Sequence, residues 1–369
     1  IAMAQLGEFA RAKDLLRKAA RAFGPQEGMA RARCIVGEAE IALASRDLAW
    51  PAKELDAARV TLEERGDRLN AAYARYLEAR RLVLIGRLDE AEGLLAGFDP
   101  APFPPALRTA HALVVAGIAM RRIHTKPARA ALARAKLAAR QAGIPALTAE
   151  VESACRLLHA PAARLIARGE ERPLLLEEVE ALLASRALVV DACRNGVRDG
   201  HALISLATRP VLFALARALG EAWPGDVPRN MLLARAFGAR FVDESHRMRL
   251  RVEMGRLRRL LRPLADIVAT KDGFRLAPRR AREVVVLARP IEDENGDVLA
   301  CLADGEAWSS SALALALGTS QRSVQRALDA LAAGGKVQCF GQARARRWIT
   351  PPVPGFTTTL LLPAPLPIE

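Results

Sequence analysis

One pattern recurs along the first half of the chain at intervals of 40, 39 and 37 residues. Each copy has a turn, an apolar residue, and then an alanine followed three positions later by leucine or another apolar residue. Periods of this length are typical of arrays of paired helices, in which each repeat buries its apolar face on its neighbours. A small residue at the anchor lets two helices approach closely. The anchoring alanines are Ala12, Ala52, Ala91 and Ala128.

The array is similar to tetratricopeptide (TPR) repeats, although its period exceeds the about 34 residues of that family's standard repeat. Aromatic residues make up only 4% of the chain, which favours helices filled by small and straight-chain side chains. We therefore expect residues 1–186 to form a TPR-like α-solenoid. A generic helical bundle is the alternative, because the copies are weak. A solenoid would offer a surface for a protein or small-molecule partner, and could also pair two copies as a homodimer.

Positive charge is concentrated in two places in the C-terminal half. The net charge of the chain is +14. Residues 201–290 carry 18 basic and 8 acidic side chains, and residues 319–349 carry 6 and 1. A basic cluster on a folded element is the electrostatic signature of a polyanionic partner. Coding bias explains the use of Arg in place of Lys, but it does not explain the clustering.

The helical repeat pattern ends near residue 186, and strand patterns follow. Two apolar segments, ALVVDAC (187–193) and HALISLA (201–207), flank the turn residues RNGVRDG and predict a β-hairpin. Three helical patterns come next, over 210–220, 224–238 and 243–261. The segment DIVATKDGFRLAP (266–278) then reads as strand, tight turn and strand. In the third helix the apolar residues recur at i, i+4, i+7 and i+11, which predicts one buried stripe: Leu250, Met254, Leu257 and Leu261.

The segments LRVEMGRLRRLL (250–261) and IVATKDGFRL (267–276) resemble the recognition helix and wing of the effector domain of OmpR/PhoB-type response regulators. The resemblance covers residues 187–278 and implies a winged-helix domain over 187–290. It does not extend to an acidic receiver domain, so it implies no control by phosphorylation. In such a domain the recognition helix enters the major groove of DNA. Arg247, Arg249 and Arg251 would then reach base edges or phosphates, and Arg258 and Arg259 would touch the DNA backbone or cap the helix end. A solvated arginine face on a surface helix is the alternative.

A second set of helical patterns occupies residues 291–350. GDVLACLADG (296–305) predicts a short helix, and the serines at 309–311 predict a cap for the next one. The alternating ALALAL (312–317) would suit a strand on period alone, but Gly318 and the amphipathic segment after it favour a helix. The segment TSQRSVQRALDALAAGG (319–335) predicts a second helix of a helix-turn-helix. KVQCF (336–340) and ARRWI (345–349) predict a wing.

This second set resembles the winged helix-turn-helix of many bacterial transcription regulators. Gln and Arg can make bidentate contacts to adenine and guanine edges. The predicted DNA-binding residues at the start of its recognition helix are Ser320, Gln321, Arg322, Gln325 and Arg326. Those predicted on its wing are Arg344, Arg346 and Arg347. A protein-docking module with a solvated face is the alternative.

Other chemistries have little support in the sequence. The five Cys and five His residues form no CxxC, HxxxH or HExxH pattern, so we expect no metal and no cofactor. The GGK at 334–336 lacks the remaining residues of a phosphate-binding P-loop, and we expect no enzyme. The chain has no run of 18 apolar residues and no signal-peptide pattern, and its scattered cysteines suit a reducing compartment, so we expect a cytoplasmic protein without a membrane span.

The sequence therefore predicts a mainly α fold, with an N-terminal TPR-like α-solenoid followed by two tandem winged-helix domains. The expected divisions are 1–186, 187–290, 291–350 and a Pro-rich C-terminal tail, 351–369. The expected function is that of a bacterial transcription regulator that binds double-stranded DNA. The alternative is a non-enzymatic protein-interaction scaffold in which the winged helices are docking modules.

Overall fold

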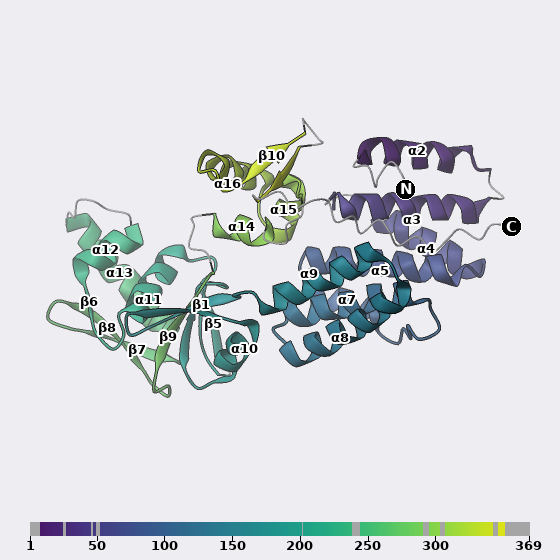
Figure 1. The fold of residues 1–369 in the computed structure, drawn as a ribbon. Coiled ribbons are helices and arrows are strands. Elements are labelled where there is room, and N and C mark those ends of the chain that lie inside the picture. The colour runs from purple at the N-terminus through teal and green to yellow at the C-terminus, as the bar shows by residue number, and fades with distance from the viewer. Residues whose placement is uncertain are drawn as a thin grey trace. The chain divides into compact units, whose positions relative to one another are not determined.

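The structure, a computed structural model, describes two compact units (Figure 1). One unit combines residues 1–158 with residues 293–369, and the other is formed by residues 159–292. Most described residues are helical, with a mixed sheet in the second unit. The described residues are 8–24, 27–45, 47–48, 52–200, 202–237, 244–290, 295–302, 307–341 and 346–350. The tail over 351–369 and Arg344 lie outside them.

The first unit begins with helices that follow one another in pairs, as the spacing of the alanines predicts. Three of these anchors, Ala12, Ala91 and Ala128, are at most 3% exposed, and Ala52 is half-buried. Each anchor lies in the first helix of its pair. The helices are α2 (Phe9–Ala22), α3 (Gly28–Ala44), α4 (Ala52–Glu64), α5 (Arg68–Leu84), α6 (Leu88–Leu95), α7 (Pro105–Arg121), α8 (Thr125–Ala142) and α9 (Pro145–His159).

The second helices of successive pairs also contact one another, α3 with α5 and α5 with α7. The turn before α6 is made by Gly86 at a φ of 80°. Ile123, which lies 37 residues further on, holds the matching turn before α8 at a φ of 61°, although a side chain disfavours this conformation. The same backbone geometry therefore recurs at the repeat spacing.

The C-terminal part of the same unit contains three helices and a short hairpin. ALALAL is helical: the Ser309 hydroxyl accepts a hydrogen bond of 3.1 Å from the Ala312 amide, and Gly318 ends the helix in the left-handed conformation. Leu313 is buried, whereas Leu315 lies across the helix and is exposed. Trp308 pairs with Trp348 in a β-bridge. The elements are α14 (Gly296–Leu302), α15 (Ser310–Leu317), α16 (Gln321–Ala333), β10 (Gln338–Phe340) and β11 (Arg347–Ile349).

This C-terminal part is not the separate domain that the sequence suggested. Its buried residues, among them Leu302, Trp308 and Leu328, belong to the same continuous apolar cluster as those of α3, α4 and α5. In addition, Arg347 Nε donates a hydrogen bond of 2.9 Å to the Ser45 carbonyl oxygen, across 302 positions of sequence. Shared burial of apolar surface therefore holds the two parts in one compact unit.

The second unit contains a six-stranded sheet in the order β2-β1-β9-β3-β4-β5. Only the β3–β9 pair is parallel, and the other neighbours are antiparallel. The helix α10 (Leu176–Ala184) connects β2 and β3. The strands are β1 (Ala163–Ala167), β2 (Glu170–Leu174), β3 (Leu188–Asp191), β4 (Gly196–Asp199), β5 (Ala202–Ser205) and β9 (Val284–Ala288).

Two details of this sheet differ from the sequence-based expectation. The boundary of the unit lies at residues 158–159, not at 186, because β1, β2 and α10 join the sheet through pairing of β1 with β9. The segment RNGVRDG is also not simply a turn. Its residues 196–199 form β4, which pairs with both β3 and β5, and Val197 is fully buried there.

Three further helices and a three-stranded sheet complete the second unit. The predicted stripe of the last helix is confirmed, because Leu250, Met254, Leu257 and Leu261 are all at most 3% exposed. The sheet is antiparallel with the order β6-β8-β7. The elements are α11 (Pro210–Glu221), β6 (Val227–Pro228), α12 (Arg229–Phe237), α13 (Glu244–Leu261), β7 (Ala265–Ala269) and β8 (Gly273–Pro278).

The pairing of β6 with β8 requires a glycine. A Cβ atom placed on Gly273 would lie 1.8 Å from the carbonyl oxygen of Val227 and 3.0 Å from the Cα of Pro228. Both neighbours are backbone atoms, so no side-chain rotation could relieve the overlap. Gly273 therefore fixes how closely the β7–β8 hairpin approaches the strand before α12.

We predict that Gly273→Ala lowers the free energy of unfolding of the second unit by about 2–3 kcal/mol, because the strands must separate to admit the methyl group. Gly255→Ala is the matched control, since its Cβ would meet no atom within 4 Å on α13. That variant should raise the free energy of unfolding by about 0.5–1 kcal/mol. Calorimetry of the full chain measures both, and equal melting temperatures for the two variants would contradict the prediction.

Candidate nucleic-acid interface

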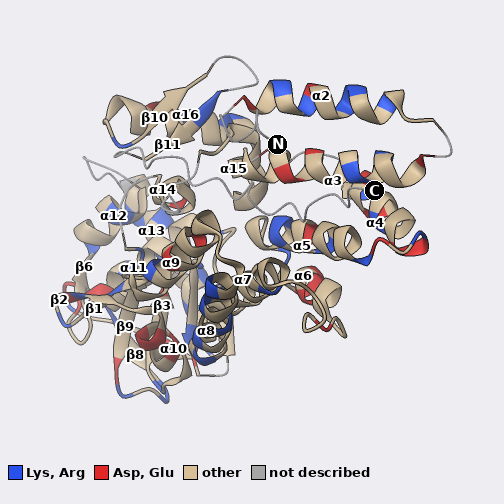
Figure 2. Ribbon diagram, turned by 45° about the vertical axis from the view of Figure 1, so that its right-hand side comes forward, with Lys and Arg blue, Asp and Glu red and all other residues tan. Residues whose placement is uncertain are grey.

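The apolar stripe of α13 turns inward, so the arginines of this helix point outward. Figure 2 shows the basic residues along α13 in blue. Helical spacing places them on two flanks of the helix, with Arg259 opposite the buried stripe. One flank carries Arg247, Arg251 and Arg258, and the other carries Arg249 and Arg256. All six side chains are exposed.

One of the predicted contact residues instead supports the fold. Arg258 Nε donates a hydrogen bond of 2.8 Å to the Ile267 carbonyl oxygen in β7, and its guanidinium lies 5.4 Å from the centre of the Phe274 ring. Arg229 lies at the same distance from this ring and donates to the carbonyl oxygens of Lys271 and Thr270. The two arginines thus attach the β7–β8 hairpin to α13 and α12, and Arg258 is less available to DNA than the sequence predicted.

The remaining predicted residues of α13 stay at its surface. The guanidinium of Arg249 lies 4.7 Å from the centre of the Phe237 ring at the end of α12, a cation–π contact that orients the side chain. Arg247 and Arg251 are exposed and share one flank. These three arginines place positive charge on both flanks of the N-terminal half of α13.

The structure adds residues that sequence analysis missed. Met248 and Val252, on the outward side of α13, are 60% and 49% exposed. Their i, i+4 spacing opposite the buried stripe was visible in the sequence, but apolar residues were assigned to the core alone. Lys271 and Arg275 on the β7–β8 hairpin are exposed as well. The candidate surface therefore combines cations with a small apolar patch, and aliphatic side chains of this kind can contact thymine methyl groups.

On α16 some of the predicted DNA-binding residues form hydrogen bonds within the protein, and others are exposed to solvent. The Ser320 hydroxyl accepts a hydrogen bond of 3.1 Å from the Ser323 amide and so caps the helix. Gln321 donates to the Ser310 hydroxyl at 3.0 Å, and Gln325 donates to Asp329 at 2.9 Å. Arg322 and Arg326 are exposed one turn apart, and neither pairs with another described residue. These two arginines carry the candidate interface of this helix.

The two described arginines of the β10–β11 hairpin also have partners within the protein. The guanidinium of Arg346 lies 4.5 Å from the centre of the Trp348 ring and donates to Cys339 Sγ at 3.5 Å, while the side chain stays exposed. Arg347 is half-buried on the Ser45 carbonyl, and burial lowers its pKa. We therefore correct the expectation for Arg347, because its guanidinium attaches the hairpin to the helical region and is not directed to solvent.

The described residues include one buried acid with a strongly raised pKa, Glu40. Burial raises the pKa of Glu40 to about 7, and a hydrogen bond with Tyr73 opposes the shift. Glu40 is only 5% exposed, so it is poorly placed to meet a substrate. Within the described ranges, no group of three or more His, Cys, Asp or Glu residues could hold a metal ion. Among the helices described, none combines the length and apolar character that crossing a membrane requires.

No protein-family model, curated protein or solved structure matches this chain. The case for a function therefore rests on the geometry of α13, α16 and their hairpins. The common chemical feature of these elements is exposed guanidinium on a helix whose opposite face is buried. Guanidinium groups bind phosphate and the guanine edge through paired hydrogen bonds.

We predict that Arg258→Ala lowers the free energy of unfolding of the second unit by about 1–2 kcal/mol, because it removes a charge-assisted hydrogen bond and the contact with Phe274. Arg251→Ala, on the same flank about two turns earlier, should change it by less than about 0.5 kcal/mol. Urea denaturation of both variants makes the comparison. Equal stability of the two would show that Arg258 does not secure the hairpin.

Proposed function

We propose that this chain is a transcription regulator that binds double-stranded DNA through winged-helix modules. In the second unit the order α11, β6, α12, α13, β7, β8 is that of a winged helix, with α13 as recognition helix and the β7–β8 hairpin as wing. The short strand β6 pairs with the second strand of the hairpin. This order supports the resemblance to the effector domain of OmpR/PhoB-type regulators.

The observation that carries the proposal is that the same arrangement occurs twice. In the C-terminal part, α14 is followed by Trp308, α15, α16 and the β10–β11 hairpin, and Trp308 bridges Trp348 in the second hairpin strand. In both places the third helix buries one apolar stripe and exposes arginines. A repeated helix-turn-helix with a wing is an arrangement that places a helix in the major groove.

The distribution of side chains around α13 suggests how this helix would bind DNA. Its two basic flanks would neutralise phosphates on the two edges of the groove, and release of the counterions would supply most of the affinity. The outward residues Met248 and Val252 would meet the bases and so supply sequence preference, while Arg247 and Arg251 on one flank would bind phosphates. Lys271 and Arg275 on the hairpin would reach the neighbouring backbone.

We assign α16 a smaller share of the DNA contacts. It offers Arg322 and Arg326, whereas its glutamines already hydrogen-bond within the module. The attachment of its hairpin to Ser45 favours a second role, in which this module transmits the state of the TPR-like helical region. That region would sense or dock a partner and could pair two chains on DNA half-sites. The same attachment is the observation that favours the scaffold alternative.

We predict that the chain binds a mixed-sequence duplex, with an affinity that falls about a thousandfold or more between about 50 and 200 mM salt. Arg247→Ala with Arg251→Ala should weaken binding at least about tenfold and reduce the salt slope by about two. Arg322→Ala with Arg326→Ala should have a smaller effect. Fluorescence anisotropy of a labelled duplex over a salt series measures each.

The control is Arg21→Ala with Arg140→Ala, which removes the same charge from exposed positions on α2 and α8. It should leave duplex affinity within about twofold of the original, because neither residue lies on a proposed recognition helix or wing. Absence of duplex binding by the unaltered chain at low salt would refute the proposal and favour the scaffold.

A further inference from the structure

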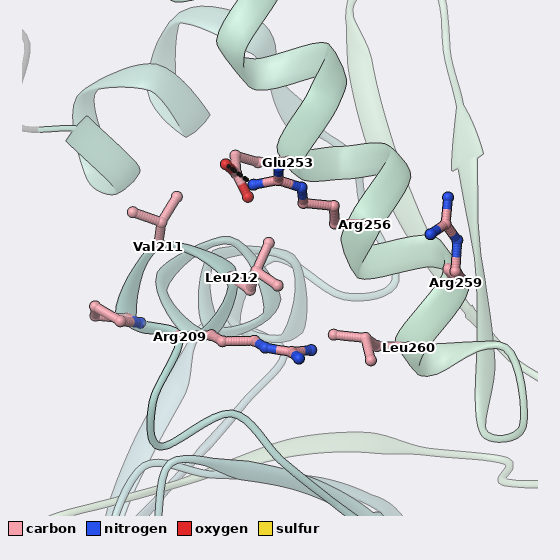
Figure 3. A pocket seen from close by; sticks show the side chains of 8 residues that line it. Arg209, Val211, Leu212, Glu253, Arg256, Arg259 and Leu260 are labelled. Atoms are coloured by element: carbon pink, nitrogen blue, oxygen red, sulfur yellow. Dashed lines mark hydrogen bonds and ion pairs between the residues drawn. The ribbon is translucent and has the colours of Figure 1, made fainter.

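A cavity of about 490 Å³ lies in the second unit, between the start of α11 and the C-terminal half of α13. Figure 3 shows Arg209 extending toward Leu260 from the start of α11, and Arg256 turned toward Glu253 on α13. Arg259 lines the cavity from the same helix. Leu212 and Leu260 line its apolar part. The cavity is distinct from the N-terminal half of α13, which carries Arg247 and Arg251.

The charged residues of this cavity are unbalanced. Glu253, the acidic residue that lines it, accepts a hydrogen bond of 2.9 Å from Arg256. Arg209 and Arg259 are exposed at its rim, and neither pairs with a described acidic side chain. Two elements thus bring two exposed cations without a described acidic partner to the lining of one hollow. A bound anion would compensate this charge.

The backbone adds hydrogen-bond donors on the same side. The first backbone hydrogen bond of α11 runs from the Phe213 amide to the Arg209 carbonyl oxygen, at 3.0 Å. The amides of Val211 and Leu212 therefore precede the helical hydrogen-bond series. These two amides would donate hydrogen bonds to a bound anion in addition to those from the arginine side chains.

We propose that this cavity binds a phosphate group. Guanidinium groups arranged around a hollow suit a tetrahedral dianion or a phosphodiester, because each can donate two parallel hydrogen bonds to its oxygens. The apolar part formed by Leu212 and Leu260 would accommodate the carbon skeleton attached to the phosphate. Because Arg256 lies on a flank of α13, the source we expect is a backbone phosphate of the duplex, and this assignment rests on the proposed function.

Arg209→Gln tests the duplex as the source. It removes a rim cation from α11 without altering the recognition helix. It should weaken binding of a mixed-sequence duplex about threefold to tenfold and reduce the salt slope by about one, uniformly across sequences. Arg259→Gln should act likewise. Arg186→Gln, an exposed residue between α10 and β3, removes the same charge away from the cavity and should leave the salt slope unchanged.

Calorimetric titration with inorganic pyrophosphate, without DNA, tests a free phosphate as the source. Loss of pyrophosphate binding in Arg209→Gln, with duplex binding intact, would assign the cavity to a small phosphorylated ligand. Unchanged duplex binding and unchanged pyrophosphate binding in both cavity variants would overturn the proposal. Melting temperatures within about 2 °C of the original would show that the variants are folded. If the unaltered chain binds no duplex, the proposed function fails, while the pyrophosphate titration still decides the cavity.

Discussion

Burial of one stripe on α13 is the constraint on which the candidate interface depends. Leu250, Met254, Leu257 and Leu261 are nearly inaccessible, and together they fix the rotation of the helix about its axis. At about 1.5–3 kcal/mol for each buried side chain, no competing rotation could be as stable. Every other position of the helix is then assigned to a flank or to the outward face, and the arginines occupy both.

Arginine has two different uses in this chain, and the structure separates them. Arg258 and Arg229 enclose the Phe274 ring and bind hairpin carbonyl oxygens, and Arg347 binds the Ser45 carbonyl. These residues hold the hairpins in place. Arg251, Arg322 and Arg326 project from helices without such partners. The same side chain can serve both uses because its charge persists and its planar donors suit a carbonyl oxygen as well as a phosphate.

Local periodicity predicted much of the fold. Local spacing predicted the helices that contain Ala12 and Ala91, the helical conformation of ALALAL and the buried stripe of α13. Each of these features depends on residues that lie within a few helical turns of one another. The sheet was not predictable in this way. Val284–Ala288 inserts between β1 and β3, and no local pattern specifies which strands neighbour it. The strand at 196–199 was hidden by turn-forming residues on both sides.

The candidate site was predictable only at the level of the helix that carries it. Spacing correctly placed Arg251 and Arg322 on exposed faces. It could not show that Gln321 donates to Ser310 in the preceding helix, or that Arg347 reaches a carbonyl 302 positions away, because such partners are set by tertiary packing. The exposure of Met248 could not be predicted for a related reason. An apolar residue is assigned to the core until the buried face of its helix is known.

Hydrogen exchange of the full chain, with and without a duplex, tests the central claim most directly. The account predicts slower exchange at the backbone of α13 and at the turn between β7 and β8 when duplex is present, with α2 to α6 unchanged. Helix α16 should show a smaller change in the same direction. Slower exchange confined to the helical region, with α13 unaffected, would contradict the account.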